Sequence, residues 1–410
     1  MVNFEIPKHR VVVTGLGAVS SIGIGVENFW PSLLAGRSGV SPVSSFDTVH
    51  HASTIGGEIR DFHPEKHVRP EILPHCGRAS QLAIAAARLA LHQSGLSSAS
   101  LPAAESGIFV GTTMGECQLQ ESLVRGWNQH QETRLDPGMV LQVPHGNLAC
   151  NVAWDLDLEG CACLTIPTAC AAANYALLNA FDAIRDGSIR IALAGGADAF
   201  SQTAHTGFGR MMALTPDRCR PFDKNRQGII IGEGAAILVL ESLAHARQRG
   251  SPILAELLGG AFGCDAHHMT IPNRPTIAAV MRKALAACNL APEQIDAVSA
   301  HGTGTRQNDQ TEAQAIREVF GPNPARPPVF SIKSMLGHTM GAASGLEAIA
   351  CVMALRDGWL PPTIHFETPD EECPVDCVPN QARRTDPKII MNNAFAFGGN
   401  NAITVFARVN

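Results

Sequence analysis

Cys170 is the residue whose surroundings most clearly suggest chemistry. It ends the run TIPTAC, between an apolar, strand-like segment at 161–166 and an alanine- and leucine-rich, helix-like segment at 171–180. A thiol at such a turn lies near unpaired backbone N–H groups and the positive end of a helix dipole. Both features favour the thiolate, which is the nucleophilic form of cysteine. The alternative is a small buried cysteine without chemistry, which is common in proteins.

Three further segments place polar side chains among glycines at the ends of apolar runs. His301 begins the run HGTGT, in which the glycines allow a ligand to approach closely and the hydroxyls can bind it. Lys333 and His338 lie in the run SIKSMLGH, and Phe397 lies in the loop-like run NNAFAFGGNN. Taken singly, each of these residues also fits an ordinary structural role.

The elements that would position these residues alternate between strand and helix. The sequence predicts strands at residues 10–16, 108–111, 191–195, 235–240 and 295–300, and helices at 78–92 and 276–287. This alternation indicates an α/β fold with buried sheets. Because the pattern restarts near residue 254, we expect two related halves, one over residues 1–253 and one over residues 254–410.

Composition and charge restrict the class of protein. The chain has 410 residues, of which 45% are hydrophobic and 17% are charged, so it can bury a large core. Its net charge of −6 provides no general basic field for nucleic acid. The 12 cysteines are scattered without zinc spacing, so we expect neither a disulfide framework nor a metal site. No uncharged apolar run reaches the roughly 18 residues of a membrane span, and a secretory signal is lacking, which predicts a cytoplasmic protein.

Taken together, the motifs resemble those of the β-ketoacyl-ACP synthases, the elongating ketosynthases of the thiolase superfamily. The resemblance covers nearly the whole chain and rests on VVTGLG, TAC, RPFDK, GEG, HGTGT, KSMLGH and FGG, in that order. It implies the thiolase fold, in which two duplicated α/β halves form a five-layered αβαβα sandwich. It also implies a dimer, either of identical chains or with a related ketosynthase-like subunit.

The resemblance implies a reaction at Cys170. An acyl chain passes from the phosphopantetheine of acyl carrier protein (ACP) to Cys170, while backbone N–H groups of Cys170 and Phe397 form the oxyanion hole. Malonyl-ACP then loses CO2, and the resulting carbanion attacks the thioester to release 3-oxoacyl-ACP. Such chemistry extends a fatty acid or polyketide chain, and no cofactor is implied because the substrates arrive on ACP.

The remaining catalytic roles also follow from the resemblance. His301 and His338 would donate hydrogen bonds from Nε2 to the enolate oxygen. Lys333 would hold the histidine network electrostatically, and Glu312 would be the acidic partner of this lysine. A buried lysine without a counter-charge tends to lose its proton, so a carboxylate beside Lys333 is physically reasonable.

Further residues match positions that contact substrate or carrier protein in the family. The implied substrate-binding residues are Thr303, Thr305, Thr270, Met114 and Phe208. Because ACP is acidic, its docking face should be locally basic, and the implied docking residues are Lys66, Arg69, Arg78 and Arg210.

One departure from the family pattern concerns the loop at Phe397. The family usually has glycine where this chain has Ala396, and alanine reaches positive φ at a higher energy than glycine does. We therefore expect a gate loop that moves less freely, in a specialised or secondary-metabolite ketosynthase.

Other functions are compatible with part of the pattern. The chain could be the catalytic half of a ketosynthase/chain-length-factor heterodimer. A non-condensing partner subunit would usually lack the nucleophile, whereas Cys170 is present. A degradative thiolase would carry a second cysteine near its C-terminus, and residues 392–401 contain none. A Cys-His hydrolase would share the nucleophile but not the order of the motifs.

Overall fold

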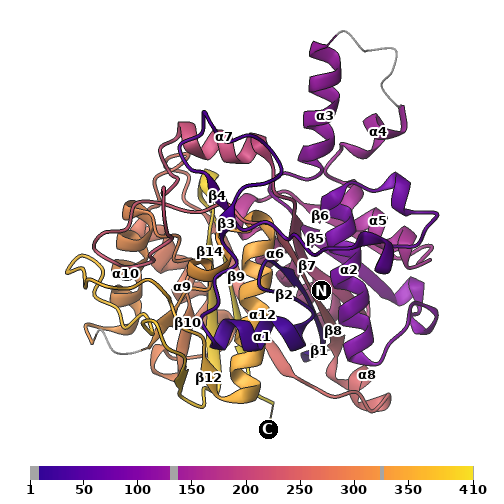
Figure 1. Cartoon of the computed structure of the whole chain (residues 1–410). Coiled ribbons are helices and arrows are strands. Elements are labelled where there is room, and N and C mark those ends of the chain that lie inside the picture. Colours follow the sequence, from indigo (N-terminus) through magenta and orange to yellow (C-terminus); the bar gives the residue numbers. More distant parts are fainter. Residues whose placement is uncertain (1–8, 130–136, 324–326, 410) are drawn as a thin grey trace.

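A mixed sheet runs through the whole molecule, and its two halves pack against the central helices (Figure 1). The computed structural model describes residues 9–129, 137–323 and 327–409. Within them, the main sheet has the strand order β11-β10-β14-β15-β9-β1-β8-β7-β5-β6. The strands of the first half are β1 (Val11–Ser20), β5 (Ser106–Gly111), β6 (Ala162–Ile166), β7 (Ile191–Asp198) and β8 (Gly234–Ser242). Those of the second half are β9 (Ala255–Cys264), β10 (Ala297–Ser299), β11 (Val329–Phe330), β14 (Ile389–Phe395) and β15 (Asn400–Ala407).

The same pairing pattern occurs twice in this sheet. In the first half, β1 is antiparallel to β8, β8 is antiparallel to β7, and β7, β5 and β6 are parallel. In the second half, β9, β15, β14, β10 and β11 repeat this series. A short antiparallel contact between β1 and β9 joins the two sets. The duplicated α/β fold predicted from the sequence is therefore confirmed.

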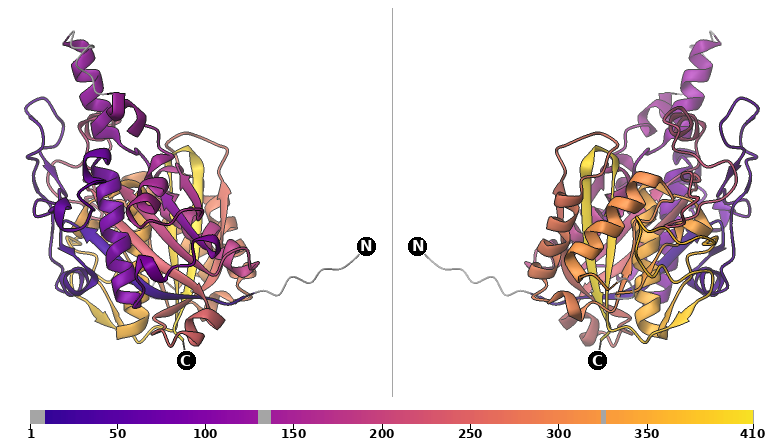
Figure 2. Two further views of the ribbon diagram at one scale, coloured as in Figure 1. Left: turned by 90° about the vertical axis from the view of Figure 1, so that its right-hand side faces the viewer. Right: turned by 90° about the vertical axis from the view of Figure 1, so that its left-hand side faces the viewer.

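Helices and the two halves of the sheet form five layers: outer helices, one half of the sheet, the central helices, the other half of the sheet, and outer helices. The longer helices are α1 (Val26–Leu34), α2 (Arg78–Ser94), α3 (Cys117–Asn128), α5 (Asn147–Asp155), α6 (Ala172–Arg185), α7 (Gln202–Arg210), α9 (Arg274–Ala287), α10 (Arg306–Phe320) and α12 (Ala343–Asp357). Short helices are α4 (Pro137–Gln142), α8 (Leu243–Gln248) and α11 (Lys333–Leu336). α2 and α5 cover the outside of the first half, and α9 and α10 cover the outside of the second (Figures 1 and 2).

The middle layer consists of α6 and α12. α6 contacts strands of both halves, and α12 contacts β8 on one side and β14 on the other. Small residues allow this close approach: a Cβ atom on Gly111 would lie 2.2 Å from the carbonyl carbon of Ala172, at the start of α6. α12 is buried around its whole circumference over its first thirteen residues, as expected for a helix that is apolar on all sides.

α3 and α4 project from the body as an arm (Figure 1). Their apolar side chains are largely uncovered, since Trp127 is 62% exposed and Leu141 is 75% exposed. In the part of the chain that is described, no helix has both the length and the apolar character needed to cross a bilayer.

Candidate active site

Cys170 lies at a tight turn between β6 and α6. A short 3-10 turn (Ala169–Ala171) makes this connection, and Ala169 adopts a positive φ of 51°. A non-glycine residue pays about 1 kcal/mol or more for this conformation, so packing around it must hold the turn. The turn directs the thiol into a cavity of about 700 Å³, where Cys170 is only 5% exposed.

The Cys170 thiol is not acidic in the free protein. Burial raises the pKa of Cys170 to about 12. The positive charge of Lys333 lowers this pKa and the carboxylate of Asp198 raises it, while the N–H of Phe397 favours the thiolate. The expectation of a thiolate stabilised by the helix terminus is therefore wrong for the unliganded chain, because desolvation outweighs the backbone N–H groups.

Both histidines present a protonated Nε2. The Nδ1 atom of His338 accepts a hydrogen bond of 3.1 Å from the backbone N–H of Met340. Nδ1 of His301 lies 3.4 Å from Nζ of Lys333, and an ammonium group can only donate. In each neutral ring the proton consequently resides on Nε2. Burial lowers the pKa of both histidines well below the ordinary value, so both rings are neutral.

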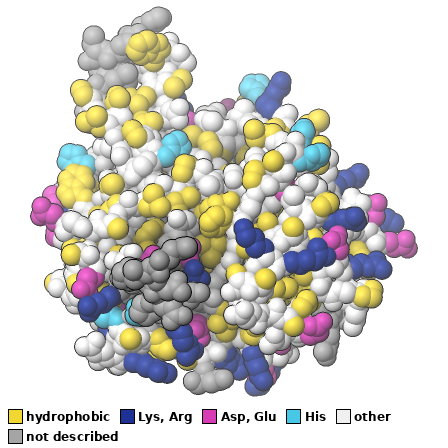
Figure 3. Space-filling model, turned by 180° about the vertical axis from the view of Figure 1, so that it is seen from behind, with side chains coloured by type: hydrophobic (Ala, Val, Ile, Leu, Met, Phe, Trp, Pro, Cys, Tyr) yellow, Lys and Arg dark blue, Asp and Glu magenta, His cyan; other side chains and the backbone are white. Residues whose placement is uncertain are grey.

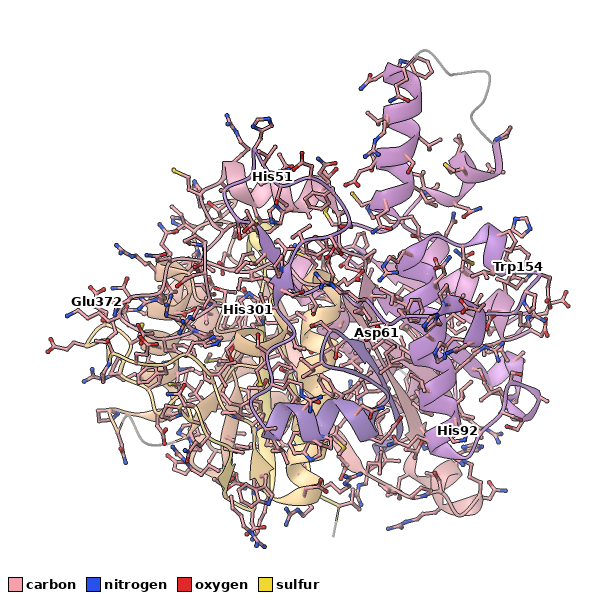
Figure 4. All side chains as sticks on the ribbon, in the orientation of Figure 1. His51, Asp61, His92, Trp154, His301 and Glu372 are labelled. Carbon is pink, nitrogen blue, oxygen red and sulfur yellow. The ribbon has the colours of Figure 1, made fainter. Side chains whose placement is uncertain are left out.

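The two imidazoles face the thiol's cavity together. Their ring centroids are 5.5 Å apart at an interplanar angle of 83°, and both residues line the cavity that contains Cys170. The Nε2 atom of His338 is buried and has no partner in the described residues. In Figure 4, His301 lies inside the body of the molecule, below α7. The site thus holds two hydrogen-bond donors that an incoming oxygen can engage.

Lys333 pairs with Glu347, a residue of α12 that sequence reasoning missed. The buried Lys333 ammonium forms an ion pair and hydrogen bond with the Glu347 carboxylate. Glu312, the predicted partner, instead accepts backbone hydrogen bonds from His301 (2.9 Å) and Gly302 (2.8 Å). That assignment is wrong because the carboxylate of Glu312 is already occupied with the backbone that carries His301. Burial raises the pKa of each glutamate to about 7.

A second missed carboxylate, Asp198, joins two segments beside the site. It ends β7 and accepts hydrogen bonds from Thr112 Oγ1 (2.8 Å), Thr113 N (2.7 Å) and Met114 N (2.8 Å). It also accepts one of 2.6 Å from the N–H of Gly341, three residues after His338. The signal was an acid at the end of an apolar strand, which Asp198 is in the run ALAGGAD.

The loop at Phe397 needs glycine at positions other than 396. Ala396 has an ordinary extended backbone, with φ −118° and ψ 155°. Gly398 and Gly399 have φ of 81° and 78°, in the region that favours glycine. In this conformation, alanine at 396 therefore causes no backbone strain. The Phe397 ring stacks on Phe208 of α7, with centroids 5.5 Å apart.

The same cavity collects most of the predicted substrate-binding residues. Its lining includes Phe208, Thr270, Thr303 and Thr305, together with Met211, Met212, Ile271 and Arg306, which sequence reasoning did not select. Met114 does not belong to this lining and packs instead in an apolar cluster with Phe200 and Met340. Its predicted contact with an acyl chain is therefore not seen at this cavity.

Comparisons with known proteins identify the family. The N-terminal domain profile of β-ketoacyl synthase matches residues 8–246, and the C-terminal domain profile matches residues 254–367. The chain belongs to the β-ketoacyl synthase family. Nodulation protein E of Rhizobium meliloti (strain 1021) is 37% identical over 402 residues, which cover 98% of this chain and 100% of that protein. The 3-oxoacyl-[acyl-carrier-protein] synthase 2 of Synechocystis is 35% identical over an alignment of 417 residues, which covers 100% of this chain and 100% of that protein.

Solved structures agree with this β-ketoacyl synthase assignment. A chain of the ishigamide ketosynthase/chain length factor is 46% identical with a TM-score of 0.96. The superposition covers 98% of this chain and 100% of that chain. A chain of the type II PKS complex AntDE:AntF, in which acyl-carrier protein is bound to its ketosynthase, is 29% identical with a TM-score of 0.90 and the same coverage. The five-layered thiolase fold implied by the sequence resemblance is confirmed.

The basic residues predicted for carrier docking in this β-ketoacyl synthase differ in their surroundings. Lys66 and Arg210 are exposed. Arg69 donates a 2.6 Å hydrogen bond to Asp157. Arg78 forms a two-point ion pair with buried Glu233, at 2.8 and 2.7 Å. Arg78 is thus a structural counter-charge, and its assignment to the docking face is wrong because a buried carboxylate occupies it.

No cluster in the described residues of this β-ketoacyl synthase brings together three side chains able to hold a metal ion.

Proposed function

We propose that this β-ketoacyl synthase is a 3-oxoacyl-ACP synthase, a decarboxylating acyltransferase that elongates fatty acid or polyketide chains. The observation that carries the proposal is a single cavity that joins the Cys170 thiol with two neutral imidazoles, His301 and His338. Relatives named 3-oxoacyl-[acyl-carrier-protein] synthase support this reaction.

In the first step, Cys170 exchanges its thiol with the thioester of acyl-ACP. The Cys170 sulfur attacks the acyl carbonyl, whose developing oxyanion is placed to accept hydrogen bonds from the N–H groups of Cys170 and Phe397. The bond to the phosphopantetheine sulfur then breaks. The proton lost by Cys170 ends on the departing thiol, so the exchange consumes no net proton, and a raised thiol pKa does not prevent it.

In the second step, malonyl-ACP loses CO2 beside the two histidines. The enolate oxygen accepts hydrogen bonds from Nε2 of His301 and of His338, which both line the cavity. No group in the described residues competes for Nε2 of His338. Neutral rings suit this role because they donate without transferring a proton to the carbanion. The carbanion attacks the acyl thioester, and Cys170 leaves as a thiolate.

Lys333 supports both steps from behind His301. Its contact with Nδ1 keeps the proton of His301 on Nε2, and its charge lowers the pKa of Cys170. Glu347 compensates the buried ammonium, and Glu312 fixes the backbone at His301 and Gly302. These are positioning roles, since neither glutamate lines the cavity.

The proposal includes a carrier protein but no resident cofactor, since ACP delivers both substrates on phosphopantetheine. Thr303 and Thr305, whose hydroxyls lie 3.0 Å apart on the cavity wall, are suited to bind the polar pantetheine arm. Arg210 ends α7 directly before the cavity residue Met211, so it can meet the acidic carrier at the entrance. We place the reaction in the cytoplasm.

A second ketosynthase-like subunit completes the proposed assembly. Apolar side chains are spread over the face of the molecule seen in Figure 3. Exposed apolar residues also occur on the arm, at Trp127 and Leu141, and on β6, at Leu164. The 46% identity with a chain of a ketosynthase/chain length factor favours a heterodimer over a homodimer.

The test is intact-protein mass after incubation with a panel of acyl-ACPs, followed by malonyl-ACP. We expect an acyl adduct on the wild type and none on Cys170→Ala, and we expect malonyl-ACP to discharge the adduct as 3-oxoacyl-ACP. A matched variant, Cys76→Ala, removes a buried cysteine in an apolar cluster away from the cavity and should still acylate. The panel is repeated with a co-expressed chain-length-factor subunit, and absence of an adduct in both forms would overturn the proposal.

A further inference from the structure

Asp198 connects the two halves of the chain beside the active site. Its fully buried carboxylate ends β7 of the first half. Oδ2 of Asp198 accepts a 2.6 Å hydrogen bond from the backbone N–H of Gly341, which belongs to the second half. Gly341 is the middle residue of a 3-10 turn, Met340–Ala342, that begins two residues after His338. The segment with His338 is therefore anchored to a strand of the other half.

The anchored turn has a strained backbone. Met340 is not glycine, yet its φ is 53°, in the region that other residues reach only at an energetic cost. This conformation directs the N–H of Met340 to Nδ1 of His338, at 3.1 Å. Such a turn persists only where its surroundings hold it. Because Gly341 directly follows Met340, its hydrogen bond to Asp198 acts on the strained position itself.

The duplicated fold makes this turn the counterpart of the one that contains the nucleophile. Each is a short 3-10 turn before a helix of the middle layer, and each begins with a non-glycine residue at positive φ, 51° at Ala169 and 53° at Met340. Gly341 therefore stands in the second half where Cys170 stands in the first. A Cβ atom on Gly341 would lie 2.7 Å from Oδ2 of Asp198, so the position has room only for a backbone N–H that meets this carboxylate.

We propose that Asp198 is a positioning residue for the decarboxylation of malonyl-ACP. By holding the N–H of Gly341, its carboxylate keeps the N–H of Met340 on Nδ1 of His338, and so keeps the imidazole proton on Nε2. The catalytic consequence rests on the proposed function, whereas the position of the proton can be measured without any substrate.

Asp198 is suited to this anchor because each of its oxygens accepts two hydrogen bonds. Oδ1 accepts from Thr112 Oγ1 and Met114 N, both at 2.8 Å. Oδ2 accepts from Thr113 N at 2.7 Å and from Gly341 N at 2.6 Å. Three of these four donors are backbone N–H groups, which cannot accept in return. Removing the side chain therefore leaves three buried N–H groups without this acceptor, and the turn at Gly341 must move to satisfy its own.

Loss of the anchor should affect the two half-reactions differently. A His338 ring with its proton on Nδ1 presents an acceptor at Nε2, which repels the enolate oxygen, and loss of one such donor slows a reaction by about 10²–10³. Acylation instead uses the N–H groups of Cys170 and Phe397. The charge of Asp198 also raises the pKa of Cys170, so its removal favours the thiolate. We expect Asp198→Ala to slow CO2 release at least about tenfold and acylation less than about threefold.

The test is ¹⁵N NMR of the full chain labelled in histidine, because the chemical shift of a ring nitrogen reports whether it bears a proton. The signals of His338 are assigned by their loss in His338→Ala. We expect the wild type to show a protonated Nε2 and an unprotonated Nδ1. In Asp198→Ala we expect the proton on Nδ1, or in exchange between the two nitrogens. Single-turnover acylation and CO2 release from malonyl-ACP are measured on the same proteins.

Two variants serve as matched controls. Asp198→Asn can turn its amide oxygen to Thr113 and Gly341 and its NH2 group to the Thr112 hydroxyl, which leaves only the N–H of Met114 without a partner. The opposite orientation leaves two N–H groups without one, so Asp198→Asn should keep the anchor and the wild-type signals. Thr112→Val removes a hydrogen bond from the same carboxylate but not the one from Gly341, and it should also keep the wild-type signals.

Unchanged Nε2–H signals in folded Asp198→Ala would overturn the inference. So would a Thr112→Val variant that moves the proton as far as Asp198→Ala does, or equal losses in both rates. Where Asp198→Ala does not fold, an ester in place of the backbone amide of Gly341 removes only the N–H that Asp198 binds, and it should move the proton in the same way. A wild type that neither acylates nor releases CO2 would contradict the proposed function, and the NMR signals would still decide whether Asp198 positions His338.

Discussion

Nζ of Lys333 lies 3.4 Å from Nδ1 of His301, on the side of the imidazole away from the reaction cavity. The contact assigns the imidazole proton to Nε2, because the ammonium cannot accept a hydrogen bond. The same ammonium pairs with Glu347 of α12, so the donor that faces the substrate depends on a helix in the middle layer. The catalytic surface and the core are coupled through this one lysine.

Lys333→Met and Glu347→Gln should each destabilise the protein by about 3 kcal/mol, because each leaves a buried ionisable group without its partner. The double variant should lose less than the sum of the two, since it contains no buried charge at this position. Urea unfolding of the four proteins measures this cycle. Additive losses would show that the pair is not coupled.

The histidines predict the pH dependence of decarboxylation. Burial holds the pKa of His301 and His338 well below the unfolded value of 6.5, so both remain neutral as pH falls through that value. The rate of CO2 release from malonyl-ACP should therefore not decline between pH 8 and about 6.5 for lack of neutral imidazole. A rate that halves near pH 6.5 in the wild type, with ACP intact, would contradict neutral donors.

Glu312 predicts a pH-dependent part of the stability. Its pKa is about 7 in the folded protein and 4.5 by the ordinary value, so the folded state binds more protons between these pH values. The free energy of unfolding should fall as pH rises through this window, by at most about 3 kcal/mol from this group.

Glu312→Gln removes that titration, although its amide also disturbs one backbone hydrogen bond by a constant amount. The stability of the variant relative to wild type should therefore rise from pH 4.5 to 7. Thermal unfolding at several pH values provides the comparison. A difference that is independent of pH would show that Glu312 titrates normally.

Replacing Gly399 by alanine should disturb the gate loop, whereas replacing Ala396 by glycine should not. A Cβ atom on Gly399 would lie 2.7 Å from Cβ of Asp265, at a φ of 78°. Gly399→Ala should slow acylation of Cys170 by at least about tenfold through a displaced loop, since such strain costs about 1–3 kcal/mol. Ala396→Gly should change the rate by less than about fivefold, because its cost is mainly the entropy of the loop, about 1 kcal/mol or less. Single-turnover acylation compares them.

Docking of the carrier protein should depend on the exposed residues Lys66 and Arg210, and not on Arg78, which is paired with Glu233. Lys66→Glu and Arg210→Glu should raise KM for acyl-ACP at low salt, with kcat and the melting temperature unchanged. Lys283→Glu on α9 is a matched reversal in the outer layer and should leave KM unchanged. Arg78→Glu should instead reduce stability, because it would face the buried Glu233 carboxylate. Equal KM values for all the exposed reversals would remove Lys66 and Arg210 from the docking face.

The sequence predicts the nucleophile and both histidines because each lies in a distinctive motif of the family that the chain resembles: Cys170 and His301 follow apolar strands, and His338 follows α11. It does not predict Glu347, because this residue lies in an otherwise apolar helix and meets Lys333 only when α11 and α12 pack together. The ion pair of Arg78 could not be predicted for the same reason. Its partner Glu233 is distant in the sequence and meets Arg78 only in the folded chain.

Local propensity predicts some of the elements and misses others, such as β9, β14, β15 and α12. The predicted helices at 78–92 and 276–287 correspond to α2 and α9, with small differences at their ends. β1 continues to Ser20, beyond the predicted residue 16, because its register with β8 extends to that residue across a bulge between Val13 and Gly15. Strand length is determined here by a partner more than two hundred residues away, which periodicity cannot reveal.

The shared middle layer has a consequence for synthesis on the ribosome. α6 emerges early, but it lies against α12, which is made some 170 residues later. Until α12 arrives, the nascent first half has an uncovered apolar surface and Cys170 lacks the walls of its cavity. A fragment that ends between the halves would lack the cavity residues His301, His338 and Phe397, so the site of Cys170 is complete only when nearly the whole chain has left the exit tunnel.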